Sequence, residues 1–126
     1  MFGFSKEQIL SNEKEIERLF LKNNSFEEIP FRILWRVEEN INEVPLKSLI
    51  VVPKKQLNLA FERNKVKRRI REALRKKKLM LEETLKENKK QINLAIIYQK
   101  KEILDYTIIE QKIKVILDRL KKKLCN

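Results

Sequence analysis

Apolar and polar residues alternate most regularly over residues 31–38, FRILWRVE. An alternation with a period of two predicts a β-strand that buries one face. Two other short segments, 46–52 (LKSLIVV) and 92–99 (INLAIIYQ), are more continuously apolar, which is typical of strands covered on both faces. We therefore expect a small sheet in which the 46–52 strand, ended by Pro53, has a central position. The apolar members of the alternating strand are Phe31, Ile33, Trp35 and Val37.

Three further segments have apolar residues at the spacing of an α-helix. In the first, residues 11–20, either Ser11 or Asn12 can cap the N-terminus, and Glu15 stands three residues after Asn12, in capping-box spacing. Its apolar face comprises Ile16, Leu19 and Phe20.

The second helical segment runs from Arg63 to about Glu87, and the third covers residues 107–124. Thr107 and Glu110 have capping-box spacing at the start of the third. The expected core positions are Val66, Ile70, Ala73, Leu74, Leu81 and Leu85 in the second segment, and Ile109, Ile113, Ile116, Leu117, Leu120 and Leu124 in the third.

The segments between these elements are less regular. Residues 22–30 are expected to form a polar loop and residues 39–45 a turn, whereas residues 54–62 are compatible with a brief strand or an irregular crossover. The order helix, strands, helix, strand, helix predicts an α+β fold with helices packed on a small sheet. A chain of 126 residues is expected to form one domain, residues 1–126.

Positive charge is concentrated in one part of the chain. The net charge is +12, which favours a polyanionic partner, with nucleic acid ahead of an anionic membrane. Between Lys54 and Lys78 there are twelve basic residues and two acidic ones, so this window carries ten of the twelve net charges. A patch of this kind differs from the uniform charge of a disordered basic tail.

The basic residues at the expected start of the second helix are unfavourable in a free helix. The helix macrodipole disfavours cations there by about 0.3 to 1 kcal/mol each, and like charges at i, i+4, such as Lys67 and Arg71, add about 0.2 to 0.5 kcal/mol. Both effects reverse when phosphates bind this face. The pattern therefore predicts a phosphate-backbone site, although a solvated basic face is the alternative. The cations expected near the helix start are Arg63, Lys65, Lys67 and Arg68, and the face opposite the apolar stripe comprises Asn64, Lys67, Arg68, Arg71, Arg75 and Lys78.

Several function classes are disfavoured by the composition. The chain has no histidine, its single cysteine is Cys125, and its acidic residues show no metal-ligand spacing, so we expect neither a catalytic residue nor a metal site in the protein. No apolar run approaches the roughly 20 residues of a membrane span, and the N-terminus does not resemble a secretion signal. We expect a cytoplasmic protein. The basic run at 119–124 needs no ligand, because cations are favourable at a helix C-terminus.

One segment resembles a known family. Residues 51–75, VVPKKQLNLAFERNKVKRRIREALR, are similar to the signature segment of the bacterial ribonuclease P protein subunit, and the N-terminal pattern from Phe4 to Phe20 and the segment 91–124 also resemble that family. The resemblance is specific because residue identity and spacing agree together. The matching positions are Arg63, Asn64, Lys67, Arg68, Arg71, Glu72 and Ala73.

The resemblance implies an α+β fold of order α-βββ-α-β-α with a left-handed β-α-β crossover, against the usual right-handed rule. It also implies that the protein assists a catalytic RNA, which uses Mg²⁺ to remove the 5′ leader from precursor tRNA. The implied contacts to ribonuclease P RNA are Arg63, Asn64, Lys65, Lys67, Arg68, Arg71 and Arg75, with Asn64 also capping the helix.

A second implied site is a cleft between the first helix and the sheet that binds the single-stranded leader. Aromatic residues there would stack on bases with little sequence selection. The alternative is that these rings are core residues: the alternation in 31–38 equally allows Trp35 to be buried, and Phe20 can pack beneath the sheet. The implied cleft residues are Phe20, Phe31, Trp35, Lys54 and Lys55, with Arg32 or Arg36 at the edge.

Two other functions are compatible with a basic patch. A structural RNA-binding protein of the ribosomal type would have the patch without the leader cleft. A helix that binds DNA or a membrane surface is a weaker alternative, because the expected sheet and core argue against a free amphipathic peptide.

Overall fold

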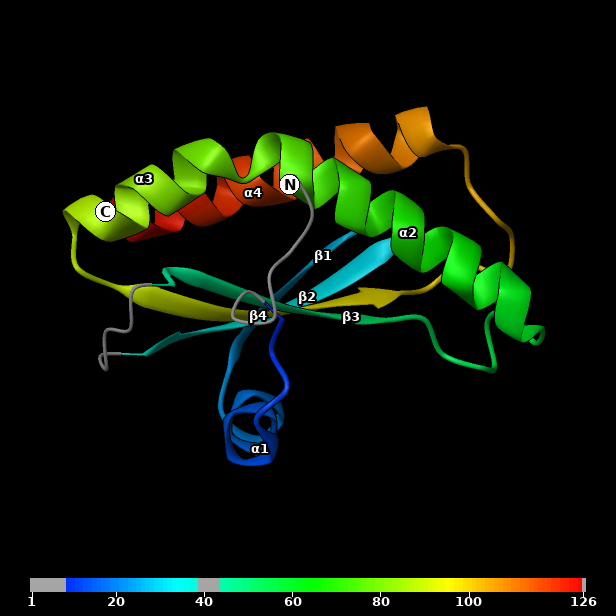
Figure 1. The fold of residues 1–126 in the computed structure, drawn as a ribbon, viewed down its shortest axis with the longest axis horizontal. Helices are drawn as coiled ribbons and strands as arrows, with labels where there is room; N and C mark the ends of the chain where they lie inside the picture. The colour runs from blue at the N-terminus through cyan, green and yellow to red at the C-terminus, as the bar shows by residue number, and fades with distance from the viewer. Residues whose placement is uncertain (1–8, 39–43, 126) are drawn as a thin grey trace.

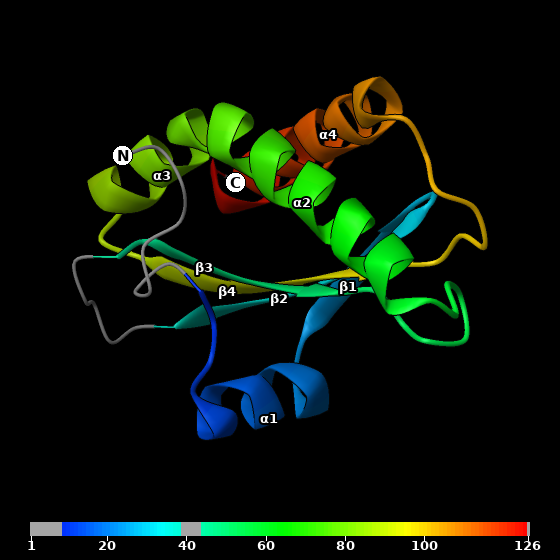
Figure 2. The same cartoon turned by 45° about the vertical axis from the view of Figure 1, so that its right-hand side comes forward.

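Residues 9–38 and 44–125 are described by the structure, a computed structural model. A four-stranded sheet lies between helices on its two faces, with α1 on one face and the other three helices on the opposite face (Figures 1 and 2). In chain order the elements are α1 (Glu13–Leu21), β1 (Asn24–Glu28), β2 (Phe31–Glu38), β3 (Leu46–Val51), α2 (Ala60–Lys77), α3 (Leu79–Glu87), β4 (Gln91–Tyr98) and α4 (Tyr106–Cys125).

The strand order in the sheet is β1-β2-β4-β3. β2 is antiparallel to β1 and β4, whereas β3 is parallel to β4. The α+β class and the order α-βββ-α-β-α are confirmed, with α2 and α3 together forming the crossover from β3 to β4. Strands β3 and β4 both run to the right in Figure 1, β3 lies nearer the viewer, and the helices return above the sheet. The crossover is therefore left-handed, as the family resemblance implied.

The predicted central position of the 46–52 strand is wrong, because β3 lies at an edge of the sheet. Its apolar residues are explained by cover on both faces. Leu46 and Ile50 belong to the core beneath α2, whereas Leu49 packs with the cluster beneath α1. The outer edge is partly closed by the preceding chain, where the Leu10 N–H donates to the Ser48 carbonyl at 3.0 Å.

Strand β1 was predicted to be a loop because its sequence, NSFEE, is mostly polar. It pairs with β2 along its whole length, contacts α4, and packs a single apolar residue, Phe26, against the main core. Glu28 forms ion pairs with Lys112 at 3.4 Å and Arg119 at 3.1 Å, and the Arg119 guanidinium lies 4.0 Å from the ring centroid of Phe26. Part of the terminal basic run is thus used within the fold. The expected turn at 39–45 lies mostly outside the described residues.

The helix boundaries also differ from those predicted. The single helix expected over 63–87 is two helices: α2 starts at Ala60, and Lys78 separates it from α3. Asn12 caps α1 as predicted, accepting from the N–H groups of Lys14 and Glu15, but the Glu15 carboxylate turns to Lys47 and Asn93 and does not complete a capping box.

The capping box expected at Thr107 is wrong, because α4 already begins at Tyr106. The Glu110 carboxylate there accepts from the Tyr106 hydroxyl at 2.9 Å.

Two apolar clusters flank the sheet. The larger lies between the sheet and α2, α3 and α4, and it buries every predicted core position of these helices except Leu124, which is partly buried. The smaller cluster, beneath α1, comprises Leu10, Leu19, Leu34 and Ala95. Because side chains alternate along a strand, β2 and β4 supply residues to both clusters.

Candidate nucleic-acid interface

The solvent side of α2 carries most of the predicted RNA-binding residues. Val66, Ile70 and Ala73 are buried, so the opposite side of the helix points to solvent. We call this surface the basic stripe: Asn64, Lys65, Lys67, Arg68, Arg71 and Arg75. Its most exposed members are Asn64, Lys65, Arg68 and Arg71, and its partly buried members are Lys67 and Arg75.

The earlier start of α2 changes the electrostatics of the stripe. The first turn is Ala60–Arg63, and the effect of the macrodipole fades beyond the first turn. The penalty predicted for Lys65, Lys67 and Arg68 is therefore wrong, although their mutual repulsion remains. Asn64 is not the helix cap: Leu59 occupies that position and makes no side-chain cap hydrogen bond.

Arg63 is partly committed to the protein itself. Its Nη1 donates to the carbonyl oxygens of Leu57 at 3.0 Å and Asn58 at 2.9 Å. These bonds fix the turn that leads into α2, so only the other N–H groups of this guanidinium remain for a phosphate.

Arg75 is also paired within the protein. Its guanidinium donates through Nε and Nη2 to both carboxylate oxygens of Glu72. The hydrogen bond from Arg75 lowers the pKa of Glu72, and the same bond raises the pKa of Arg75. The pair carries no net charge, so the excess positive charge of the stripe belongs to Lys65, Lys67, Arg68 and Arg71.

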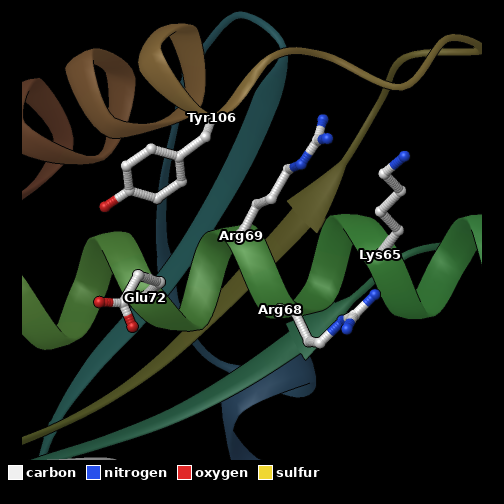
Figure 3. Close-up of a pocket in the computed structure, with 5 residues that line it drawn as sticks. All are labelled: Lys65, Arg68, Arg69, Glu72 and Tyr106. Carbon is white, nitrogen blue, oxygen red and sulfur yellow. The ribbon is translucent and has the colours of Figure 1, made fainter.

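A shallow pocket of about 380 Å³ opens beside the stripe, between α2 and the start of α4. Figure 3 shows Lys65 and Arg69 extending toward the loop before α4, whereas Arg68 extends from the other side of the helix. Arg69 Nη1 donates to the Leu104 carbonyl at 2.6 Å. The pocket is lined by Lys65, Arg68, Arg69, Glu72 and Tyr106.

Tyr106 forms the wall of this pocket and remains uncharged at neutral pH. Burial and the hydrogen bond to Glu110 raise the pKa of Tyr106 to about 12. Lys76 Nζ lies 5.5 Å from the centroid of its ring. Sequence reasoning did not select Tyr106, because only the contact between α2 and α4 brings it to the stripe, or Arg69, which is on α2 but outside the predicted solvent face.

Phe31 and Trp35 do not lie on the α1 side of the sheet, so the structure contradicts their place in the predicted leader cleft. Both belong to the core beneath α2 and α4, with the Phe31 side chain fully buried and Trp35 9% exposed. The Phe31 ring packs against Tyr98, with the ring centroids 5.8 Å apart. Neither ring has a free face for a base. The alternation in β2 was interpreted correctly, but it does not say which face meets α1.

The α1 side of the sheet carries different residues of β2. Leu34 packs beneath α1, and Arg32, two positions along the strand, is exposed on the same face. Phe20 is 45% exposed on α1, and Lys54 and Lys55 are exposed in the turn after β3. These four residues stay candidates for a leader cleft.

Arg36 lies on the same face and is held by an ion-pair cluster. Arg36 and Arg18 donate to opposite oxygens of the Glu38 carboxylate, at 2.8 and 2.9 Å. Burial alone would raise the pKa of Glu38, but the two arginine hydrogen bonds outweigh it and hold the pKa below its usual value. Beside this cluster is a pocket of about 280 Å³ lined by Arg18, Leu21, Lys22 and Arg36.

Residues 9–38 and 44–125 contain no cluster of three or more His, Cys, Asp or Glu side chains that could hold a metal ion. In the same ranges, no helix combines the length and apolar character that crossing a bilayer requires.

Comparison with known proteins identifies the family. The sequence model of the family described as Ribonuclease P matches residues 4–121. The chain belongs to the ribonuclease P protein family. A ribonuclease P protein component from Porphyromonas gingivalis is 30% identical over 119 residues, covering 94% of this chain and 87% of that protein.

Solved structures of ribonuclease P proteins have the same fold. The protein from Thermotoga maritima superposes with a TM-score of 0.67 at 26% identity, covering 88% of this chain and 96% of that one. A Staphylococcus aureus ribonuclease P protein mutant with defective mRNA degradation activity superposes with a TM-score of 0.70 at 21% identity. The match covers 92% of this chain and 90% of the mutant. Family membership makes this chain an RNA-binding component of an endoribonuclease complex that processes tRNA.

Proposed function

We propose that this chain is the protein subunit of a ribonucleoprotein ribonuclease P, in which it binds two RNAs on opposite faces of its sheet. The basic stripe on α2 binds the catalytic RNA, and the face beneath α1 binds the 5′ leader of precursor tRNA. The observation that carries the proposal is the family match over residues 4–121. Four cations of the stripe lie outside the ion pairs of the described residues and support the RNA contact: Lys65, Lys67, Arg68 and Arg71.

Catalysis belongs to the RNA subunit, with Mg²⁺ bound to that RNA. The protein contributes positive charge where two polyanions meet, and this lowers their mutual repulsion. Cations such as Arg68 and Arg71 replace counterions on the RNA backbone, so the protein reduces the Mg²⁺ concentration that the reaction needs. This role implies a cytoplasmic protein with a preference for RNA over duplex DNA.

The leader face combines charge with one aromatic side chain. Arg32, Lys54 and Lys55 can contact phosphates, and Phe20 offers an exposed ring for base stacking, which tolerates any base. Because these groups read no base edges, binding should depend on the presence and length of the leader more than on its sequence.

The test is 5′-end cleavage of a precursor tRNA by the cognate ribonuclease P RNA at low Mg²⁺, with and without the protein. We expect stimulation that is lost in the triple variant Lys65→Gln, Arg68→Gln, Arg71→Gln. The matched control, Lys86→Gln, Lys89→Gln, Lys90→Gln, removes three exposed lysines near the end of α3 and should retain stimulation. Absence of stimulation by the folded wild-type protein would reject the proposal.

A second measurement separates this role from that of a structural RNA-binding protein. The protein–RNA complex should bind precursor tRNA more tightly than mature tRNA, and Arg32→Gln should reduce that difference. Equal affinity for the two tRNAs would leave the RNA contact intact and remove the leader site from the proposal.

A further inference from the structure

An aromatic side chain lies at the start of the basic helix. Phe61 is in the first turn of α2 and is 66% exposed, and the preceding Leu59 is 50% exposed. A single exposed apolar residue is ordinary on a protein surface. The position of Phe61 relative to the cations therefore decides what it can do.

Phe61 lies in line with the basic stripe. On an α-helix, residues at i, i+4 and i+7 lie on one face, so Phe61, Lys65 and Arg68 follow one another along the solvent side of α2. Lys65 is one turn from Phe61 and Arg68 is two turns from it. Lys65 and Arg68 also line the pocket against Tyr106, where Arg69 adds a third cation.

The backbone that carries Phe61 is held in place before any ligand arrives. Leu57 is buried in the main core, and Arg63 Nη1 binds the carbonyl oxygens of Leu57 and Asn58. A ring on a fixed turn loses little conformational freedom on binding, which favours a defined contact.

We infer that Phe61 stacks on the base of an unpaired nucleotide of ribonuclease P RNA whose neighbouring phosphates bind Lys65 and Arg68. This inference rests on the proposed function. A nucleotide combines a flat base with a negatively charged phosphate. The protein surface combines the ring of Phe61 with the cations Lys65 and Arg68, so the two are complementary. The nucleotide must be unpaired, because bases within an RNA duplex have no free face.

The catalytic RNA, not the leader, supplies this nucleotide. Phe61 is on α2 with Lys65 and Arg68, whereas α1 and the candidate stacking residue that it carries, Phe20, lie on the other side of the sheet (Figure 2). The stacking contact should therefore affect binding of ribonuclease P RNA without affecting the leader.

The experiment measures the affinity of the full-length protein for the cognate ribonuclease P RNA at several salt concentrations. Phe61→Ala should weaken binding by about 5- to 150-fold, the range of one lost base stack, with an unchanged slope of log K against log salt because no phosphate contact is lost. Phe61→Tyr should bind like the wild type. Phe61→Leu, which keeps apolar area but removes the ring, should weaken binding as Phe61→Ala does.

Two control variants complete the set. Met80→Ala removes an apolar side chain on α3 that is 62% exposed and outside the basic stripe, and it should bind like the wild type. Arg68→Ala should reduce the salt slope by about one, as expected for a phosphate contact.

The outcomes separate this inference from the proposed function. Failure of the wild-type protein to bind the RNA would reject both. Wild-type binding with an unchanged affinity for Phe61→Ala, or full binding by Phe61→Leu, would reject the stacking contact alone. A loss confined to precursor tRNA binding, with ribonuclease P RNA binding intact, would also overturn the inference because the nucleotide would come from the wrong RNA.

Discussion

Basic residues that are close together in the sequence have different tasks in the structure. Arg63, Arg69 and Arg75 each donate hydrogen bonds within the protein, to backbone carbonyls or to Glu72. Within the described ranges, Arg68 and Arg71 form no hydrogen bond or ion pair, so they are available to phosphate. The family signature identified the whole run, but it did not separate these groups. The partners of Arg63 and Arg69 lie outside α2, where spacing cannot indicate them, whereas Glu72 and Arg75 have i, i+3 spacing on one helix.

Trp35 also shows the limit of sequence reasoning at this scale. Its alternation with Ile33 and Val37 correctly placed it on one face of β2, yet the same pattern allowed that face to be core or cleft. In the structure the ring is buried, and its Nε1–H has no hydrogen-bond partner among the residues described.

This burial leads to a prediction about stability. Trp35→Ala should lower the free energy of unfolding by about 3 to 5 kcal/mol, because it leaves a large cavity. Trp35→Phe should cost much less, because removing an unpaired buried donor offsets part of the lost packing. Urea unfolding followed by circular dichroism measures both. Precursor tRNA binding per folded molecule should be unchanged in either variant. A specific loss of leader binding would instead show that Trp35 contacts the leader.

At the scale of elements, apolar periodicity located the three longer strands and the buried faces of the helices, except that Phe20, expected on the apolar face of α1, is 45% exposed. It missed β1, because that strand has one apolar residue, Phe26, and therefore no alternating pattern; the strand is also stabilised by pairing with β2 and by the charges of α4. It also placed β3 centrally, because a continuously apolar segment indicates cover on both faces and not the number of neighbouring strands. Helix ends were less predictable. The carboxylates of Glu15 and Glu110 were expected to accept from the N-cap backbone, but they accept from the side chains of Asn93 and Tyr106 instead.

The attachment of α1 to the sheet depends on a charged cluster, and this predicts a pH dependence. The lowered pKa of Glu38 means that its ionised form stabilises the folded state. This contribution is present above the ordinary pKa of 4.5 and is lost as the pH falls through the lowered value. Glu38→Gln should therefore be less stable than the wild type at neutral pH, and the difference should shrink as the pH falls below 4.5.

Urea unfolding of both proteins across this pH range provides the measurement. Glu83→Gln changes an exposed carboxylate in the middle of α3, away from the helix ends, and is the matched control, for which we expect little change in stability. A stability difference for Glu38→Gln that persisted in acid would show that the carboxylate charge is not responsible.

For the whole molecule, the sequence predicted the α+β class from the order of elements, whereas the left-handed crossover came only from the family resemblance. Handedness depends on where the chain passes above the sheet, and no local pattern records it. The separation of two candidate RNA faces is likewise a property of the assembled sheet: β2 sends Phe31 and Trp35 to one face and Arg32 and Arg36 to the other.

The net charge of +12 gives opposite expectations for folding and for RNA binding. In the free protein, salt screens the repulsion along α2, so the melting temperature should rise as NaCl increases from about 0.02 to 0.2 M. Over the same range, affinity for ribonuclease P RNA should fall, because counterion release becomes less favourable. Thermal unfolding and filter binding measure the two effects. A melting temperature that fell with salt would mean that the ion pairs of the fold outweigh the repulsion.

The position of β4 has a consequence for synthesis of the protein. β4 lies between β2 and β3 and pairs with both. These two strands therefore become parts of one sheet only when residues 91–98 are in place between them. On the ribosome, therefore, the sheet cannot close until about four fifths of the chain has emerged, although the β1–β2 hairpin and α2 are made earlier. The basic helix thus leaves the ribosome before the sheet that will hold it exists, and nascent chains that end before β4 should be the most exposed to misfolding and to premature capture by RNA.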